Sequence, residues 1–127
     1  MSGTSILYIE DNLGNRMLVR RVLEAEGYTV EVATDGPAGL ELAAQGNPSL
    51  ILLDINLPEI DGYDLARRMR GMSNLEDVPI LAVTANVMEG DKEKTLAAGC
   101  DGFIPKPIDV DKLPEQIKAA LEKGRRV

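Results

Sequence analysis

Acidic residues stand at the ends of two apolar runs that read as strands. Glu10 and Asp11 follow one run, and Asp54 ends the other. If these three carboxylates share a crevice about 4 Å apart, each pair repels by roughly 4 kcal/mol at an effective dielectric of about 20. Lys106, which follows another short apolar run, supplies one compensating charge. A hard divalent cation, Mg²⁺ (or Mn²⁺), would supply the rest, because such ions prefer oxygen ligands.

A carboxylate beside a divalent cation and a lysine is equipped to accept a phosphoryl group. The positive charges offset the charge on the phosphoryl oxygens during transfer. Asp54 is then either a metal ligand only or a nucleophile. Thr84, at the end of a further run, can donate to a phosphoryl oxygen, and the small Ala85 beside it leaves the crevice open. This chemistry asks little of acid–base catalysis, in keeping with a chain that has no histidine.

Each of these residues also has an ordinary explanation. An acidic residue at a strand end is more often a helix cap or a solvated turn residue. Glu10 and Asp11 can simply cap the next helix, Thr84 can simply end a strand, and Lys106 between two prolines can simply be exposed. The prediction of a site depends on polar residues occurring together at four of the five expected strand ends.

Apolar runs and amphipathic segments alternate along the chain, which is typical of an α/β domain. Four consecutive aliphatic residues precede Asp54, and a run without alternation indicates a strand covered on both faces. The run Thr29–Ala33 alternates in part and is expected at an edge of the sheet. The expected strands are Ser5–Ile9, Thr29–Ala33, Leu50–Asp54, Pro79–Thr84 and Gly102–Pro105.

The segments between these strands predict five helices. They run from Asp11 or Asn12 to Gly27, from Pro37 to Gly46, from Gly62 to Arg70, from Asn86 to Ala98 and from Asp109 to Lys123. The first has its apolar residues at helical spacing, at Leu18, Val19, Val22 and Leu23. In the third, Arg67, Arg68 and Arg70 are expected to face outward, and the charged fourth helix is expected to be weakly anchored. The result is a doubly wound α/β domain with a mostly or wholly parallel sheet, in which ligands bind outside the carboxyl ends of the strands.

Length and charge limit the possible functions. A chain of 127 residues suits a single domain, 1–127, with a core of about 5–123 and short flexible ends. Fourteen basic against 21 acidic residues give a net charge of -7, which argues against sequence-independent nucleic-acid binding. No apolar run approaches the ~20 residues of a membrane-spanning helix. One cysteine excludes an internal disulfide, and a cytoplasmic location is expected.

Short motifs along the chain add up to a family resemblance. They are Tyr8–Asn12, Leu53–Pro58, Asp61–Gly62, Val83–Ala85, Gly99–Gly102 and Ile104–Pro107. With them, nearly the whole chain resembles the receiver domain of two-component response regulators, which have the flavodoxin-like topology of chemotaxis regulators. The resemblance implies the strand order 2-1-3-4-5.

The resemblance also implies roles for individual residues. Asp54 would be the phospho-acceptor, and Thr84 and Lys106 would bind the phosphoryl group. Mg²⁺ would be arranged by Glu10, Asp11, Asp54 and the backbone carbonyl of Asn56. Phe103 would be an aromatic switch moving with Thr84, Asn56 and Asn86 would tune dephosphorylation, and the Lys106–Pro107 bond would be cis.

The same resemblance implies a signalling receiver rather than an enzyme. Because the chain has no histidine, the phosphoryl donor would act in trans, as a histidine kinase or a histidine phosphotransfer protein. The expected fourth helix, last strand and last helix would form an output face for a downstream protein, and homodimerisation through this face is a further expectation. Direct binding to nucleic acid or membrane is not expected.

Three alternatives use the same residues. A Mg²⁺-dependent phosphohydrolase with an aspartyl-phosphate intermediate would suit the charges, but Asn56 stands where a second acid would be useful and no cap domain is present. A flavodoxin-like nucleotide carrier is disfavoured, because Glu10 and Asp11 would repel a phosphate and the chain has few aromatic rings. A receiver-like scaffold that signals without phosphorylation is disfavoured by the complete acidic set.

Overall fold

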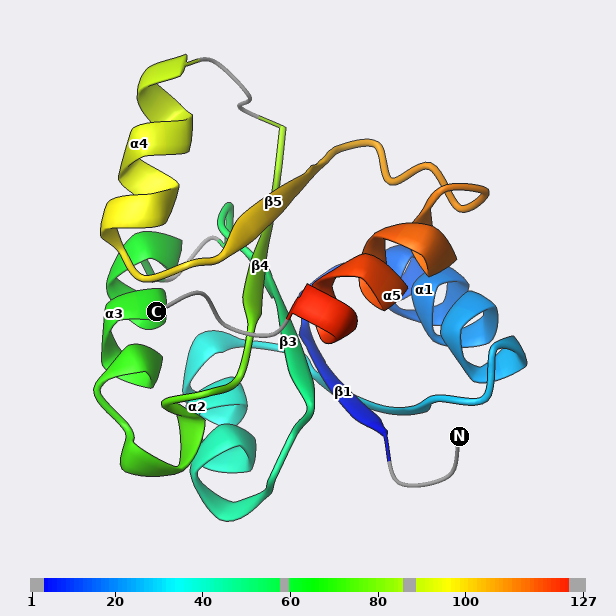
Figure 1. Cartoon of the computed structure of the whole chain (residues 1–127), viewed down its shortest axis with the longest axis horizontal. Coiled ribbons are helices and arrows are strands. Elements are labelled where there is room, and N and C mark those ends of the chain that lie inside the picture. Colours follow the sequence, from blue (N-terminus) through cyan, green and yellow to red (C-terminus); the bar gives the residue numbers. More distant parts are fainter. Residues whose placement is uncertain (1–3, 58–59, 86–88, 124–127) are drawn as a thin grey trace.

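The computed structural model describes residues 4–57, 60–85 and 89–123, and the ends expected to be flexible lie outside these ranges (Figure 1). Five parallel strands form one sheet in the order β2-β1-β3-β4-β5. The strands are β1 Ser5–Ile9, β2 Thr29–Ala33, β3 Leu50–Asp54, β4 Ile80–Thr84 and β5 Gly102–Pro105. The helices are α1 Leu13–Ala25, α2 Gly36–Gln45, α3 Gly62–Arg70, the short 3-10 helix η1 Ser73–Leu75, α4 Glu89–Ala97 and α5 Leu113–Lys123. The predicted flavodoxin-like α/β fold and its strand order are confirmed.

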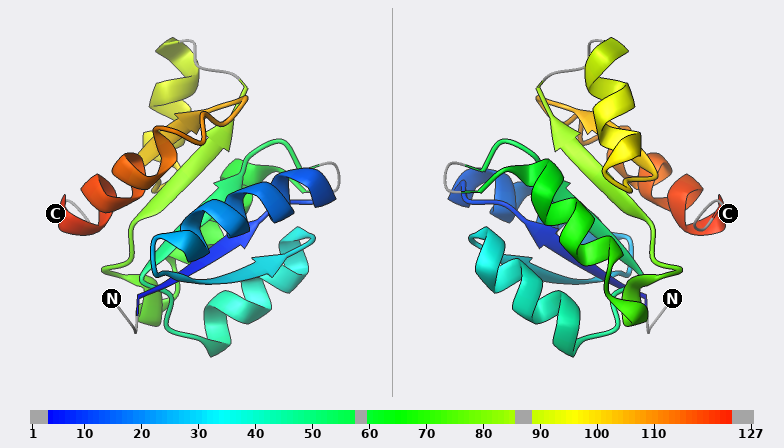
Figure 2. Two further views of the ribbon diagram at one scale, coloured as in Figure 1. Left: turned by 90° about the vertical axis from the view of Figure 1, so that its right-hand side faces the viewer. Right: turned by 90° about the vertical axis from the view of Figure 1, so that its left-hand side faces the viewer.

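Helices cover both faces of the sheet, which explains why the central strands are continuously apolar (Figure 2). All five residues of β3 and of β4 are buried. Alternate residues of β1 enter separate cores, since side chains in a strand point to opposite faces. Leu7 and Ile9 pack in the core beneath α2 and α3, whereas Ile6 and Tyr8 pack in the core beneath α1 and α5.

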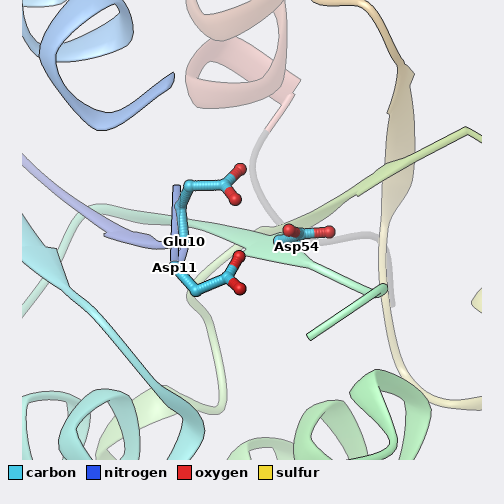
Figure 3. A group of neighbouring side chains, drawn as sticks. All are labelled: Glu10, Asp11 and Asp54. Carbon is cyan, nitrogen blue, oxygen red and sulfur yellow. The ribbon is translucent and has the colours of Figure 1, made fainter. Parts of the chain in front are cut away.

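Side-chain caps determine where the helices begin at the carboxyl edge of the sheet. Asn12 Oδ1 accepts from Asn15 N at 2.9 Å, so Asn12 caps α1. Asp35 and Asp61 cap α2 and α3 in the same way. Of the two caps predicted for the first helix, the structure uses Asn12, and the carboxylate of Asp11 points toward Asp54 instead (Figure 3).

The outward orientation expected for Arg70 is wrong. Its side chain is only 13% exposed, because it binds backbone carbonyls and Asp101. Leu18, one of the apolar residues at helical spacing in α1, is 45% exposed. The segment predicted as a polar connector, 71–77, contains η1 with a fully buried Leu75.

The last helix begins later than predicted. Helix α5 starts at Leu113 rather than Asp109, and before it the carbonyl oxygen of Asp109 accepts hydrogen bonds from Lys112 N and Leu113 N.

Helix α4 has few buried side chains in its described part. Within residues 92–97 of α4, Thr95 is buried and Leu96 is 60% exposed, so this part of the helix is sparsely anchored. In the described part of the chain, no helix combines the length and apolar character that crossing a membrane requires.

Candidate functional site

Three carboxylates meet at the carboxyl ends of β1 and β3 (Figure 3). These strands are neighbours with Ile9 opposite Leu53, so Glu10 and Asp54 come side by side, and Asp11 follows directly. One ligand oxygen from each of Glu10, Asp11 and Asp54 lies within 4.8 Å of the other two. Glu10 and Asp54 are each 1% exposed, whereas Asp11 is exposed to solvent. The convergence expected from the sequence is therefore present.

Lys106 reaches this cluster from the end of β5. Its Nζ lies 2.9 Å from Asp54 Oδ1, and the backbone N–H of Asn56 donates to the same oxygen at 2.9 Å. The loop that carries Lys106 is held in place by a 2.8 Å bond from Lys106 N to Thr84 O, and the Lys106–Pro107 peptide bond is cis. Both donors engage Oδ1, which leaves the other oxygen of Asp54 clear of them.

The other residues predicted for the site are Thr84, Phe103, Asn56 and Asn86. Thr84 is the buried last residue of β4 and stands in register with Pro105, next to Lys106. Phe103 is half-buried in β5, packs against the core beneath α2 and α3, and has Lys92 Nζ 5.4 Å from its ring centroid. The side chain of Asn56 is exposed. The prediction for Asn86 falls outside the described residues.

Glu10 has further partners that the sequence reasoning did not identify. Tyr8 OH donates to Glu10 Oε1 at 2.9 Å, and Asn12 N donates to Oε2 at 3.3 Å. Arg16 Nη1 donates to the backbone carbonyl of Glu10 at 3.0 Å. The available signal for Tyr8 is its spacing of two residues from Glu10, which directly follows the expected strand, since residues two apart in extended chain share a face.

These surroundings change the protonation of Glu10. Burial raises its pKa to about 7, assisted by a hydrogen bond with the Asp54 carboxyl and by repulsion from the charge of Asp54. The donors Tyr8 and Asn12 act in the opposite direction. Burial, with repulsion from Glu10, also raises the pKa of the Tyr8 phenol well above its usual range, so Tyr8 keeps its proton and remains a donor.

The residues of the cluster fit a divalent cation. They offer hard carboxylate oxygens close enough together to share one ion, which is the ligand chemistry of Mg²⁺. Lys106 can offset only one of three negative charges, and two of the carboxylates are almost fully buried. The cluster therefore needs either a second positive charge or a proton on one of its carboxylates to be stable.

Comparison with known proteins agrees with this geometry. The response regulator receiver domain family matches residues 6–118. This chain belongs to that family. Among its relatives, the polar-differentiation response regulator DivK of Brucella ovis is 39% identical over 117 residues, covering 92% of this chain and 95% of that protein. DivK of Brucella abortus matches to the same extent.

Solved structures of receivers superimpose closely on the fold. The chemotaxis response regulator CheY4 of Vibrio cholerae has a TM-score of 0.88 at 28% identity, with 91% of this chain and 97% of that one covered. The receiver domain of a sensor histidine kinase from Pseudomonas aeruginosa has a TM-score of 0.86 at 34% identity, with 95% and 99% covered. That structure has a magnesium ion coordinated in its active-site cleft.

The predicted family is confirmed, and with it a place in two-component signalling. The acidic cluster of this receiver resembles that of magnesium-bound receivers. A receiver domain implies a histidine kinase as partner.

Proposed function

We propose that this receiver accepts a phosphoryl group on Asp54 from a phosphohistidine of a partner histidine kinase or histidine phosphotransfer protein. The supporting observation is the ion pair between Lys106 and Asp54, at 2.9 Å, beside the acidic cluster. This pair supports the proposal because the Lys106 ammonium lies beside a carboxylate at the carboxyl ends of the strands, where ligands of doubly wound sheets bind. In this proposal Glu10, Asp11, Asp54 and the backbone carbonyl of Asn56 hold Mg²⁺.

The transfer would use the oxygen of Asp54 that Lys106 and Asn56 do not engage. Its lone pair attacks phosphorus, the O–P bond forms, the P–N bond of the donor breaks, and the electron pair stays on the imidazole nitrogen. Mg²⁺ would offset the charge on the phosphoryl oxygens. Lys106 then moves from the carboxylate to a phosphoryl oxygen, and the Thr84 hydroxyl donates to another. The chain's own part is to hold these groups in place before the donor arrives.

The output of phosphorylation is proposed to pass through α4, β5 and α5 to a downstream protein. Thr84 and Phe103 are the proposed switch residues, since they lie on the adjacent strands β4 and β5. The sparse anchoring of α4 favours this proposal, because a weakly held element is shifted by a small free-energy change. Homodimerisation through the same face is part of the proposal, as is a tuning of phosphoryl lifetime by Asn56 and Asn86.

This proposal also covers organisation and location. The core, residues 5–123, is proposed to act as one receiver unit, in the cytoplasm, where ATP-dependent kinases form phosphohistidine. The net charge of -7 supports protein partners rather than direct contact with nucleic acid.

The intact mass of the protein tests the proposal. After incubation with Mg²⁺ and a small acyl phosphate, we expect a gain of one phosphoryl group in the wild type and none in Asp54→Asn. Asp77→Asn removes an exposed carboxylate elsewhere and should behave as the wild type. No gain in the wild type, or an equal gain in Asp54→Asn, would contradict the proposal.

The alternatives give different results. In a separate assay of phosphate release, a phosphohydrolase would turn over phosphomonoesters many times, whereas the proposed receiver forms one aspartyl phosphate per chain. A scaffold that signals without phosphorylation would show no gain of mass at all.

A further inference from the structure

A buried phenol is bonded to the acidic cluster from below. Tyr8 is 0% exposed, and its OH donates to Glu10 Oε1 at 2.9 Å. Tyr8 belongs to the core beneath α1 and α5, and Glu10, two residues further and just past β1, directs its carboxylate to the same side, where the phenol meets it. The ring belongs to the core there, but the hydroxyl needs a partner, because an unbonded buried hydroxyl is unfavourable. In this structure the partner is a carboxylate of the candidate metal centre.

The Glu10 carboxylate is restrained from several directions. Tyr8 occupies one site on Oε1, and Asn12 N donates to Oε2 at 3.3 Å. Arg16, from α1, holds the backbone carbonyl of the same residue at 3.0 Å. A carboxylate oxygen accepts at more than one site, so positions remain on the side facing Asp11 and Asp54. These donors set the direction of the carboxylate before any cation is present.

We propose that Tyr8 is a positioning residue for the divalent cation. Its hydroxyl fixes Glu10 in the orientation that shares a cation with Asp11 and Asp54, and this inference rests on the proposed function. A glutamate has several rotatable bonds, and without the phenol the cation itself must order them on binding. Hydrogen-bond partners of metal ligands typically affect metal affinity about tenfold to a hundredfold.

Calorimetric titration of the unphosphorylated full chain with Mg²⁺ alone tests this inference. In Tyr8→Phe we expect affinity to fall at least about tenfold. Tyr28→Phe is the matched control, because it removes the same atom from a tyrosine packed against the same core and should bind as the wild type. Equal affinity in Tyr8→Phe and the wild type would overturn the inference alone. Failure of the wild type to bind Mg²⁺ would overturn the metal site of the proposed function as well.

A double-mutant cycle separates positioning from a general structural role. In a Glu10→Gln background, Tyr8→Phe should cause almost no further loss of Mg²⁺ affinity, because Tyr8 acts through the ligand that is already gone. If the two losses multiply instead, the role of Tyr8 is structural and the inference is wrong.

A spectroscopic measurement keeps the inference testable even if Tyr8→Phe does not fold. The chain has three tyrosines and no tryptophan, so its near-ultraviolet absorption is dominated by tyrosine. Addition of Mg²⁺ should perturb this absorption in the wild type, in Tyr28→Phe and in Tyr63→Phe, because a phenol bonded to a ligand carboxylate senses the cation. An unchanged tyrosine spectrum in protein that binds Mg²⁺ would overturn the inference.

Discussion

Two clusters of charge lie at opposite edges of the sheet, and they are composed differently. At the amino edge of β4 and β5, Arg70 pairs with Asp101 at 2.9 Å. At the carboxyl edge, Lys106 pairs with Asp54 at the same distance, but Glu10 and Asp11 stand beside that pair. The first cluster balances one cation with one anion. The second has three carboxylates for one ammonium, and this excess of negative charge is the basis of the proposed cation site.

The balanced cluster is fully used for internal bonding. The guanidinium of Arg70 donates to three backbone carbonyls besides Asp101, and Asp101 in turn accepts from Ile80 N at 2.9 Å. The three carbonyls are those of Gly99, Leu75 and Val78, at 2.8 to 3.0 Å. These bonds tie the end of α3 to η1 and to the starts of β4 and β5. The comparison indicates that a balanced buried pair holds the fold together, whereas an unbalanced one is available for binding.

The largest effect is expected at the balanced cluster. Arg70→Met removes the guanidinium from Asp101 and from three backbone carbonyls, so the free energy of unfolding should fall by about 3 kcal/mol, as for other buried pairs that lose one partner. Urea denaturation measures the change. The control is Arg68→Met, which breaks the exposed pair with Asp64 and should change stability by less than about 1 kcal/mol. Equal effects of the two substitutions would show that the buried pair stabilises the fold no more than the exposed pair does.

A slightly smaller effect is expected when a cation is added to the unbalanced cluster. At about 100 times its dissociation constant, Mg²⁺ should raise the free energy of unfolding by about 2.7 kcal/mol, because it binds the folded state only. Thermal or urea unfolding with and without Mg²⁺ measures this gain. Asp11→Asn should reduce it by weakening the site, whereas Asp77→Asn should not. A wild type that Mg²⁺ leaves unchanged would show that the excess charge binds no cation.

The smallest effect is expected from pH. Without a cation, the pKa of Glu10 is raised to about 7, so the folded state binds a proton that the unfolded state has already lost. This contribution to stability is fully present below the ordinary range of a glutamate and is lost as pH rises through about 7. Between about pH 6 and about pH 8 the loss should be on the order of 1 kcal/mol. Mg²⁺ affinity should rise over the same interval, since the proton and the cation compete.

The contribution of Glu10 is measured as the difference in stability between the wild type and Glu10→Gln. Other acidic groups also titrate, so the stability of the wild type is compared with that of Glu10→Gln at each pH in the presence of a chelator. We expect the decrease between about pH 6 and about pH 8 to be smaller in Glu10→Gln, by on the order of 1 kcal/mol. Identical pH profiles would show that Glu10 is not the group that carries the proton.

The two clusters also differ in how far the sequence predicts them. Glu10, Asp11, Asp54 and Lys106 each follow an apolar run, and the carboxyl ends of parallel strands meet at one edge of a sheet. Their convergence is therefore predictable from the order of elements. Arg70 belongs to a polar stripe with Arg67 and Arg68 on α3, and nothing in the spacing distinguishes it.

The partners of Arg70 explain why periodicity could not find it. Three of its acceptors are backbone carbonyls, which lie in η1, just before β4 and in the turn before β5. The fourth is the Asp101 side chain, from the same turn before β5. Backbone carbonyls carry no sequence signature, so an arginine that binds them looks like any exposed arginine. Leu18 is the reverse case, because it has helical spacing with Val22 but remains 45% exposed.

The sequence by itself determined the alternation of strands and helices, the buried central strands, and the set of polar residues at the strand ends. These depend on local patterns of apolar residues and on the directionality of parallel strands. Only the tertiary structure decided that Tyr8 bonds to Glu10, that Asn12 rather than Asp11 caps α1, and that Arg70 is buried. The bonds of Arg70 join segments about 30 residues apart, so they exist only once the elements pack. Those of Tyr8 and Asn12 are local, but the sequence offers each donor or cap more than one partner, and the folded backbone decides which is used.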